Sequence, residues 1–146
     1  MNPGVNASKE ELANVVLARF GLIPRKKDAK ANFYHLLLEL YERKKFANKE
    51  KKPELAVMTV EEMATQADIK RQTMYDHLKR WLILQVIKKT SFAMHGKVIT
   101  GYELNGSNIE GAFTRAQSIV NNHMETSLEY IQDLQKQIKN EKLRNK

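Results

Sequence analysis

The spacing of apolar residues between positions 59 and 90 predicts two short helices joined by a tight turn. Thr59 and Glu62 form a capping box that marks the start of the first helix. Small and apolar residues stand where the two helices would touch, namely Met63, Ala64, Ala67 and Ile69. The second helix carries a single apolar stripe at i, i+4, i+7 and i+8, formed by Met74, Leu78, Trp81 and Leu82.

After this helix the pattern changes to β-branched and aromatic residues in two runs, 86–92 and 97–104. His95-Gly96 lies between the runs and predicts a two-residue hairpin turn, in which glycine tolerates a positive φ. Three lysines on these strands, Lys88, Lys89 and Lys97, favour phosphate or minor-groove contact. The alternative interpretation is an exposed edge hairpin whose lysines resist aggregation.

Two further helices are predicted upstream of position 59. A capping box begun by Ser8 starts the first of them, and Gly21 ends it. Asp28 can cap the second helix, whose apolar positions continue to about Phe46. A lysine-rich loop is expected at 47–54.

The C-terminal segment predicts one long helix from residue 107 to about residue 143, because it contains no proline and, after Gly111, no glycine. Its apolar residues form a thin heptad-like seam, Phe113, Val120, Met124, Ile131, Leu134 and Ile138. A narrow apolar edge on so long a helix needs a cover, and a second copy of the chain is the simplest one. In the alternative, its first half folds back on its own domain, and both arrangements can hold in part.

Together these elements predict a mainly α chain with a small β-hairpin. We expect a domain at residues 1–106 and a long C-terminal dimerisation helix at 107–146.

The order of elements at 59–104 strongly resembles the winged helix-turn-helix superfamily of DNA-binding regulators, of the dimeric prokaryotic and archaeal type. In that superfamily a Thr-apolar-x-x-x-Leu-x-x-Leu recognition helix runs through a Gly-Leu-Ile corner into a basic hairpin wing. The matching residues are Thr73, Met74, Leu78 and Trp81 in the helix and Gln85, Val86 and Ile87 in the corner.

The chain departs from the superfamily pattern at two positions. Gln85 replaces the corner glycine, so either the backbone turns differently there or the helix runs longer. Lys70 replaces the usual capping serine and cannot accept a hydrogen bond from the free amides of the helix. Asp68 is an alternative cap, and it would start the helix slightly earlier.

The resemblance implies that a recognition helix at about 70–82 enters the major groove, with the wing at about 86–104 on the backbone or in the minor groove. Arg71 and Gln72 are the candidates for base readout, Arg for guanine and Gln for adenine, and Tyr75 for a base methyl or a phosphate. Phosphate contacts are expected from Lys70, Thr73, Lys79, Lys88, Lys89 and Lys97.

Charge agrees with a polyanionic partner. The chain of 146 residues has 25 Lys+Arg against 17 Asp+Glu, a net charge of +8. Six basic and five acidic residues follow position 106, so an excess of +7 lies in the predicted domain. This balance does not separate DNA from RNA or from an acidic protein.

Other classes of function are disfavoured. The chain has no cysteine, its four histidines are scattered, and it shows neither a phosphate-binding glycine loop nor a nucleophile motif. We therefore expect no enzyme, no metal and no cofactor. No apolar run approaches 18 residues, so no membrane partner is expected, and the predicted location is cytoplasmic and nucleoid-associated.

The function expected from the sequence is sequence-specific binding of double-stranded DNA by a homodimeric transcriptional regulator. The alternative is a winged-helix module for protein assembly in transcription, chromosome or plasmid machinery, because a fold does not determine a function. RNA binding is a third interpretation, weakened because Phe92 and Tyr102 are the only candidates for a stacking platform on the strands. The sequence identifies no effector.

Overall fold

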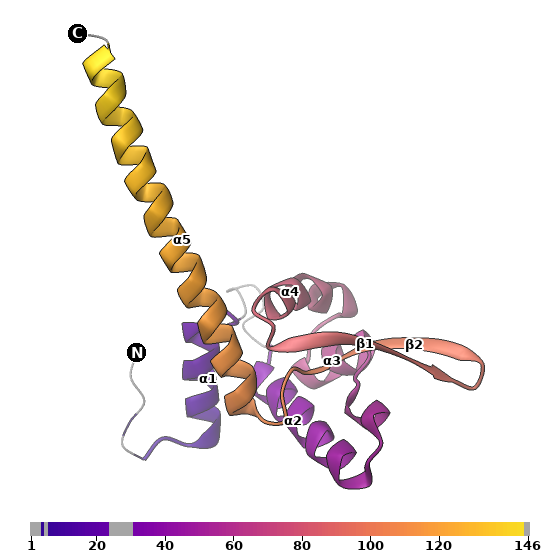
Figure 1. Cartoon of the computed structure of the whole chain (residues 1–146). Helices are drawn as coiled ribbons and strands as arrows, with labels where there is room; N and C mark the ends of the chain where they lie inside the picture. The colour runs from indigo at the N-terminus through magenta and orange to yellow at the C-terminus, as the bar shows by residue number, and fades with distance from the viewer. Residues whose placement is uncertain (1–3, 5, 24–30, 145–146) are drawn as a thin grey trace.

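The computed structural model describes residues 4, 6–23 and 31–144. In this part of the chain five α-helices, a 3₁₀ helix and a two-stranded antiparallel sheet form the fold. Figure 1 shows a body from which the hairpin projects on one side, while the last helix rises far beyond the body. The predicted fold class, mainly α with a small hairpin and a long C-terminal helix, is confirmed.

Helix α1 spans Lys9–Arg19 and begins at Ser8, whose hydroxyl accepts a hydrogen bond from the Glu11 amide at 3.2 Å. Gly21 follows the helix with a φ of +69°, the left-handed conformation that ends many helices. The start and the end of this helix are as predicted.

Helix α2 spans Phe33–Glu50 and is capped by Asn32, whose side chain accepts from the His35 amide at 3.1 Å. The predicted cap, Asp28, lies outside the described residues. The loop predicted at 47–54 is wrong in its first half, because α2 continues through Ala47, which is buried. Lys51, with a φ of +55°, ends the helix, and a 3₁₀ helix, η2, follows at Pro53–Ala56.

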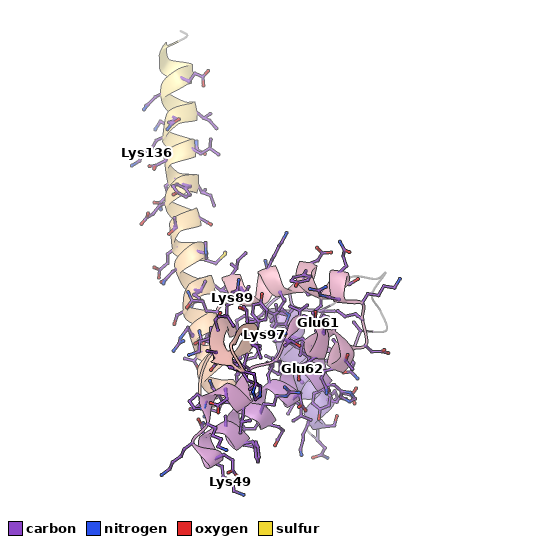
Figure 2. The ribbon with its side chains drawn as sticks, turned by 90° about the vertical axis from the view of Figure 1, so that its right-hand side faces the viewer. Lys49, Glu61, Glu62, Lys89, Lys97 and Lys136 are labelled. Atoms are coloured by element: carbon purple, nitrogen blue, oxygen red, sulfur yellow. The ribbon has the colours of Figure 1, made fainter. Side chains whose placement is uncertain are left out.

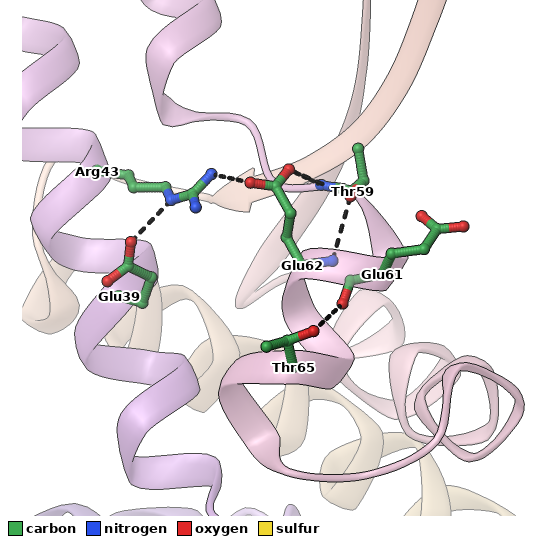
Figure 3. Close-up of polar contacts among 6 residues, drawn as sticks. All are labelled: Glu39, Arg43, Thr59, Glu61, Glu62 and Thr65. Atoms are coloured by element: carbon green, nitrogen blue, oxygen red, sulfur yellow. Dashed lines mark hydrogen bonds and ion pairs between the residues drawn. The ribbon is translucent and has the colours of Figure 1, made fainter.

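Helices α3, at Val60–Ala67, and α4, at Arg71–Ile83, form the predicted helix-turn-helix. The capping box is present: Glu62 accepts from the Thr59 amide at 3.0 Å, and Thr59 accepts from the Glu62 amide at 3.2 Å. Arg43 of α2 bonds to Glu62 at 2.8 Å and to Glu39 at 2.9 Å (Figure 3). These contacts fix α3 against α2.

The turn between α3 and α4 corrects one prediction. Asp68 has a φ of +56° and is the C-cap of α3, since its amide donates to Ala64 and Thr65. It therefore does not cap α4. Lys70 occupies the N-cap position of α4 without a side-chain hydrogen bond, as its chemistry predicts.

The corner after α4 turns through a residue of positive φ, the conformation that glycine adopts most readily. Gln85 itself adopts the left-handed conformation, with a φ of +58°, and the amide of Val86 bonds back to Trp81 at 3.1 Å. Helix α4 ends at Ile83, so it does not run longer.

Gln85→Gly is expected to stabilise the protein by about 0.5–1 kcal/mol. An L-residue in the left-handed region costs roughly 1–2 kcal/mol, which the extra chain entropy of glycine offsets only in part. The Gln85 side chain is exposed, so little packing is lost. Urea unfolding measures the gain. Ser91→Gly, at an exposed strand position, is the control and should lose stability; a loss at both positions would contradict the assignment of strain to Gln85.

Strands β1, at Ile87–Met94, and β2, at Lys97–Leu104, pair in the register Met94 opposite Lys97. The two-residue turn between them has positive φ at both positions, +52° at His95 and +76° at Gly96. This is the geometry of a type I′ turn, and it confirms the predicted hairpin. Tyr102 of β2 exchanges two backbone hydrogen bonds of 2.8 Å with Met58, so the segment before α3 holds the base of the hairpin.

The core of the body lies between α2, α3, α4 and the base of the hairpin. Its largest fully buried side chains include Trp81, Leu36, Leu40, Met63 and Met74. Helix α5, at Ile109–Arg144, contributes its first turns to this core.

Phe113 is buried in the body, and its ring lies 5.2 Å from that of Phe20. Figure 1 shows α1 beside the base of α5. The burial assigns Phe113 to its own domain, in place of the predicted dimer seam. Ala112 and Ala116 are buried in the body as well. The domain boundary predicted after residue 106 therefore does not coincide with the point at which α5 leaves the body. Among the described residues no helix is both long and apolar enough to span a membrane.

Candidate nucleic-acid interface

One side of α4 is exposed and carries most of the predicted DNA-contacting side chains. Its opposite side is buried through Met74, Leu78 and Trp81, which have relative exposures of 0 to 2%. At about 100° of rotation per residue, the predicted residues of α4 other than Thr73 share an arc of roughly a quarter to a third of the helix circumference. The exposed members of this set, which we call the α4 face, are Arg71, Gln72, Tyr75 and Lys79.

Arg71 is held in place by two neighbours. Its Nε lies 2.8 Å from a carboxylate oxygen of Glu61, and its Nη2 donates to the Tyr75 hydroxyl at 3.2 Å. The guanidinium also lies 5.5 Å from the centre of the Tyr75 ring. The hydrogen bond to Tyr75 and the charge of Glu61 raise the pKa of Arg71, so it is a permanent cation at the N-terminal end of the α4 face.

Glu61 is a residue of this interface that sequence reasoning missed. A carboxylate in the first turn of a helix is explained by the macrodipole alone, so its position in α3 carries no further signal. Its contact with Arg71 depends on the angle at which α3 and α4 meet, which local sequence patterns do not contain.

Thr73 departs from the predicted interface. It is half-buried and lies on the flank of α4 that carries His77, away from Tyr75. The ring of His77 packs edge-on against Phe33, with centroids 4.8 Å apart. This geometry does not bring Thr73 together with the α4 face. Lys70, in contrast, is exposed at the N-terminus of α4, where its side chain leaves the first amides of the helix uncapped.

The hairpin divides the three predicted lysines between its two faces. Lys89 lies opposite Tyr102, on the face whose base is buried toward the helices. Burial raises the pKa of Tyr102, and the nearby Tyr75 of α4 raises it further. Lys88 and Lys97 lie on the other face, in line with Glu103. Lys89 therefore lies on the hairpin face nearer Tyr75 of α4, whereas Lys88 and Lys97, which are also exposed, lie on the other face.

Other lysines lie far from this surface. Figure 2 shows Lys49 at the far end of the body from Lys89, and Lys136 far out along α5. The basic side chains that converge on the exposed side of α4 are thus Lys70, Arg71, Lys79 and Lys89.

A buried ion pair fixes the base of the hairpin behind the interface. Glu103 of β2 is 7% exposed, pairs with Lys44 of α2, and accepts from the Thr90 hydroxyl at 2.8 Å. Lys88 approaches the same carboxylate at 3.9 Å. Burial by itself would raise the pKa of Glu103, but the hydrogen bonds from Lys44 and Thr90 outweigh burial and lower it. The network joins the hairpin to α2.

Glu103 is expected to make the stability of the protein depend on pH in the acid range. Because its pKa is lower in the folded state than in the unfolded state, its contribution is fully present above the ordinary glutamate value of about 4.3. The contribution is lost as pH falls through the folded-state pKa. Glu103→Gln should cost about 1 kcal/mol at pH 7, since neutral hydrogen bonds are about half as strong as charge-assisted ones.

Urea unfolding at several pH values between 3 and 7 measures this effect. The difference in stability between the protein and Glu103→Gln should shrink toward acid pH. Glu42→Gln is the matched control, because Glu42 pairs with Lys45 at 3.2 Å on the surface, with about half of each side chain exposed. An unchanged difference at acid pH would contradict the proposed network.

Within the described residues, no group of three or more histidine, aspartate or glutamate side chains is placed to hold a metal ion. Comparison of the sequence with protein-family models finds no match, and comparison with curated proteins finds none either. The geometry of the α4 face and the hairpin therefore carries the functional assignment.

Proposed function

We propose that this chain binds double-stranded DNA in a sequence-specific manner, as a homodimeric transcriptional regulator associated with the nucleoid. Helix α4 enters the major groove, and the hairpin contacts the adjacent backbone or minor groove. The observation that carries the proposal is the exposed α4 face, on which Arg71 and Gln72 lie in the first turn with Tyr75 and Lys79 behind them. Helix α4 has 13 residues and a length of about 20 Å, and the major groove admits such a helix.

Base readout follows from the geometry of Arg71. To bind the O6 and N7 atoms of guanine with two hydrogen bonds, its guanidinium must exchange Glu61 for the base. Both partners of this ion pair are about 60% exposed, and such surface pairs contribute little to stability. The exchange therefore costs little. Gln72 has the donor and the acceptor that adenine requires.

A protein-assembly module is the second candidate, because one observation favours it. The outer part of the hairpin exposes apolar side chains, Val98 at 75% and Met94 at 39%. Apolar residues at the end of a projecting hairpin suit a protein partner as well as a groove. The two candidates predict different results when the α4 face is changed. A DNA-binding protein loses sequence preference, whereas an assembly module keeps its protein partner.

The test replaces Arg71 and Gln72 and measures binding to duplexes selected from random DNA. Arg71→Ala should weaken binding of the dimer to the selected duplex by a factor of about 30, from the loss of about 1 kcal/mol in each copy, the lower end of the range for a bidentate base contact, and relax the preference at one position in each half-site. Glu61→Gln should strengthen binding only slightly, since the exposed ion pair that Arg71 gives up contributes little. Lys136→Ala, far out on α5, is the control and should change neither. Unchanged preference in Arg71→Ala would favour the assembly module.

A further inference from the structure

The free part of α5 carries an apolar seam that no described part of its own chain covers. Every described side chain from Asn121 to Glu141 is exposed, as Figure 1 suggests by the way the helix leaves the body. The apolar seam residues and their relative exposures are Val120 37%, Met124 66%, Ile131 61%, Leu134 58% and Ile138 48%, and Leu128, 55% exposed, lies beside the seam position Ser127. A continuous stripe of apolar side chains in water is unfavourable, and in proteins burial of an apolar face supplies most of the stability of a helix. A partner must therefore cover this face.

The positions of the seam point to a second copy of the same helix. Seam positions 117, 120, 124, 127, 131, 134, 138 and 141 alternate steps of three and four, the heptad spacing of a two-stranded coiled coil. The same positions are symmetric about Glu129, so a helix running in the opposite direction presents a matching series. The register of an antiparallel pair is given by the sequence position that lies on the two-fold axis. Three registers, with the axis at 125.5, 129 and 132.5, place seam positions opposite seam positions.

Of these registers, the one centred on Glu129 pairs side chains best by chemistry. It places Val120 against Ile138 of the second copy and Met124 against Leu134. Its outer pair is polar, because Gln117 meets Glu141, and its one mixed pair joins Ser127 to Ile131. The register centred at 132.5 places Met124 against Glu141, and the one centred at 125.5 places Gln117 against Leu134. Only the register centred on Glu129 pairs polar residues with polar ones and apolar residues with apolar ones at the two ends of the seam.

A parallel pairing is opposed by two features. It would place Glu141 of one copy against Glu141 of the other, a like-charge contact within the seam. It would also bring the base of the second helix to within 8–10 Å of the base of the first. The body already occupies much of that space, because Ala112, Phe113 and Ala116 are buried against it on an overlapping side of α5. An antiparallel partner brings only its thin C-terminal end to this place.

We infer that two copies of α5 pair antiparallel, with the two-fold axis beside Glu129. This orientation rests on the homodimer of the proposed function, although not on DNA binding itself. The bodies lie at opposite ends of a rod, and the Phe113 positions of the two copies are about 48 Å apart along its axis. The rod, and not contact between the bodies, then sets the spacing of the two α4 helices.

The chain contains no cysteine, so introduced thiols test this pairing without background. The double variant Val120→Cys with Ile138→Cys should form covalent dimers with a short bismaleimide. Each single variant should fail to do so, because a thiol and its own counterpart in the second copy are then about 27 Å apart. The two thiols within one helix are separated by the same distance and cannot react with each other.

The matched control is Asn122→Cys with Lys136→Cys. These residues are also symmetric about Glu129 but lie on the opposite side of α5, and this pair should not crosslink. Circular dichroism confirms that each variant folds, and sedimentation gives its mass.

Crosslinking in the double variant alone supports the antiparallel pair. Crosslinking of either single variant shows a parallel pair and overturns the inference. No crosslinking in the double variant, with a monomer mass in sedimentation, also overturns it and assigns the seam to another protein. Binding of the unmodified protein to duplex DNA is measured in a separate titration. Failure of the proposed function can therefore be distinguished from failure of the pairing.

Discussion

Raising the salt concentration from 50 to 200 mM should weaken duplex binding by a factor of about 10³ to 10⁵. Each copy of the chain directs four cations to the α4 face, Lys70, Arg71, Lys79 and Lys89. Two copies make about eight phosphate or base contacts, for which the slope of log affinity against log salt is about −7. A single copy would give a slope of about −3.6, so the same titration also reports whether one or two copies bind.

Charge-neutral variants locate the contacts that produce this slope. Lys89→Gln should reduce its magnitude by about two in a dimer, one phosphate for each copy. Lys88→Gln is the sharpest control, because it removes the same charge from the adjacent residue, whose side chain lies on the other face of the hairpin. Equal effects of the two variants, or an effect of Lys136→Gln, would show that net charge alone drives the binding. Fluorescence anisotropy with a labelled duplex provides the measurement.

Local signals in the sequence predicted the ends of most elements. The Thr59–Glu62 capping box, the left-handed Gly21 and the His95-Gly96 turn each act through residues within four positions of one another. Their outcome therefore does not depend on the rest of the fold. Gln85 differs from these examples, because a glutamine adopts the positive φ that glycine favours, and its residue type does not signal this turn.

Features that depend on the packing of distant segments were missed or wrong. Helix α2 continues past Phe46 because burial of Ala47 stabilises another turn of the helix. No local sequence pattern indicates that burial. The pairing of Glu61 with Arg71 depends on how α3 meets α4. The division between Lys88 and Lys89 was available from the sequence, since adjacent strand residues point to opposite faces, and only the choice of the face nearer α4 needed the structure.

The close approach of Gly101 to the segment before α3 leads to the second strong prediction, a loss of about 3 kcal/mol of stability in Gly101→Ala. A Cβ at this position would lie 2.5 Å from the Met58 carbonyl oxygen and 2.5 Å from a methyl carbon of Val57. The Met58 backbone cannot move aside freely, because it is bonded to Tyr102 by two hydrogen bonds of 2.8 Å. The added methyl group must therefore strain or break the bridge that holds the hairpin to the body.

Thermal and urea unfolding measure this loss, which corresponds to a fall in Tm of about 10 °C for a chain of this size. Gly111→Ala is the matched control: it adds the same methyl group within α5, where the nearest atom is not backbone but the Asn108 side-chain oxygen at 3.1 Å, which accepts a hydrogen bond from the Gly111 amide at 2.7 Å. Alanine is the better helix former, so this variant should gain slightly. A folded Gly101→Ala variant should also lose affinity for duplex DNA more than Lys89→Gln does, because its whole hairpin is displaced from α4. Unchanged stability in Gly101→Ala would mean that the hairpin is not held to the body through Met58.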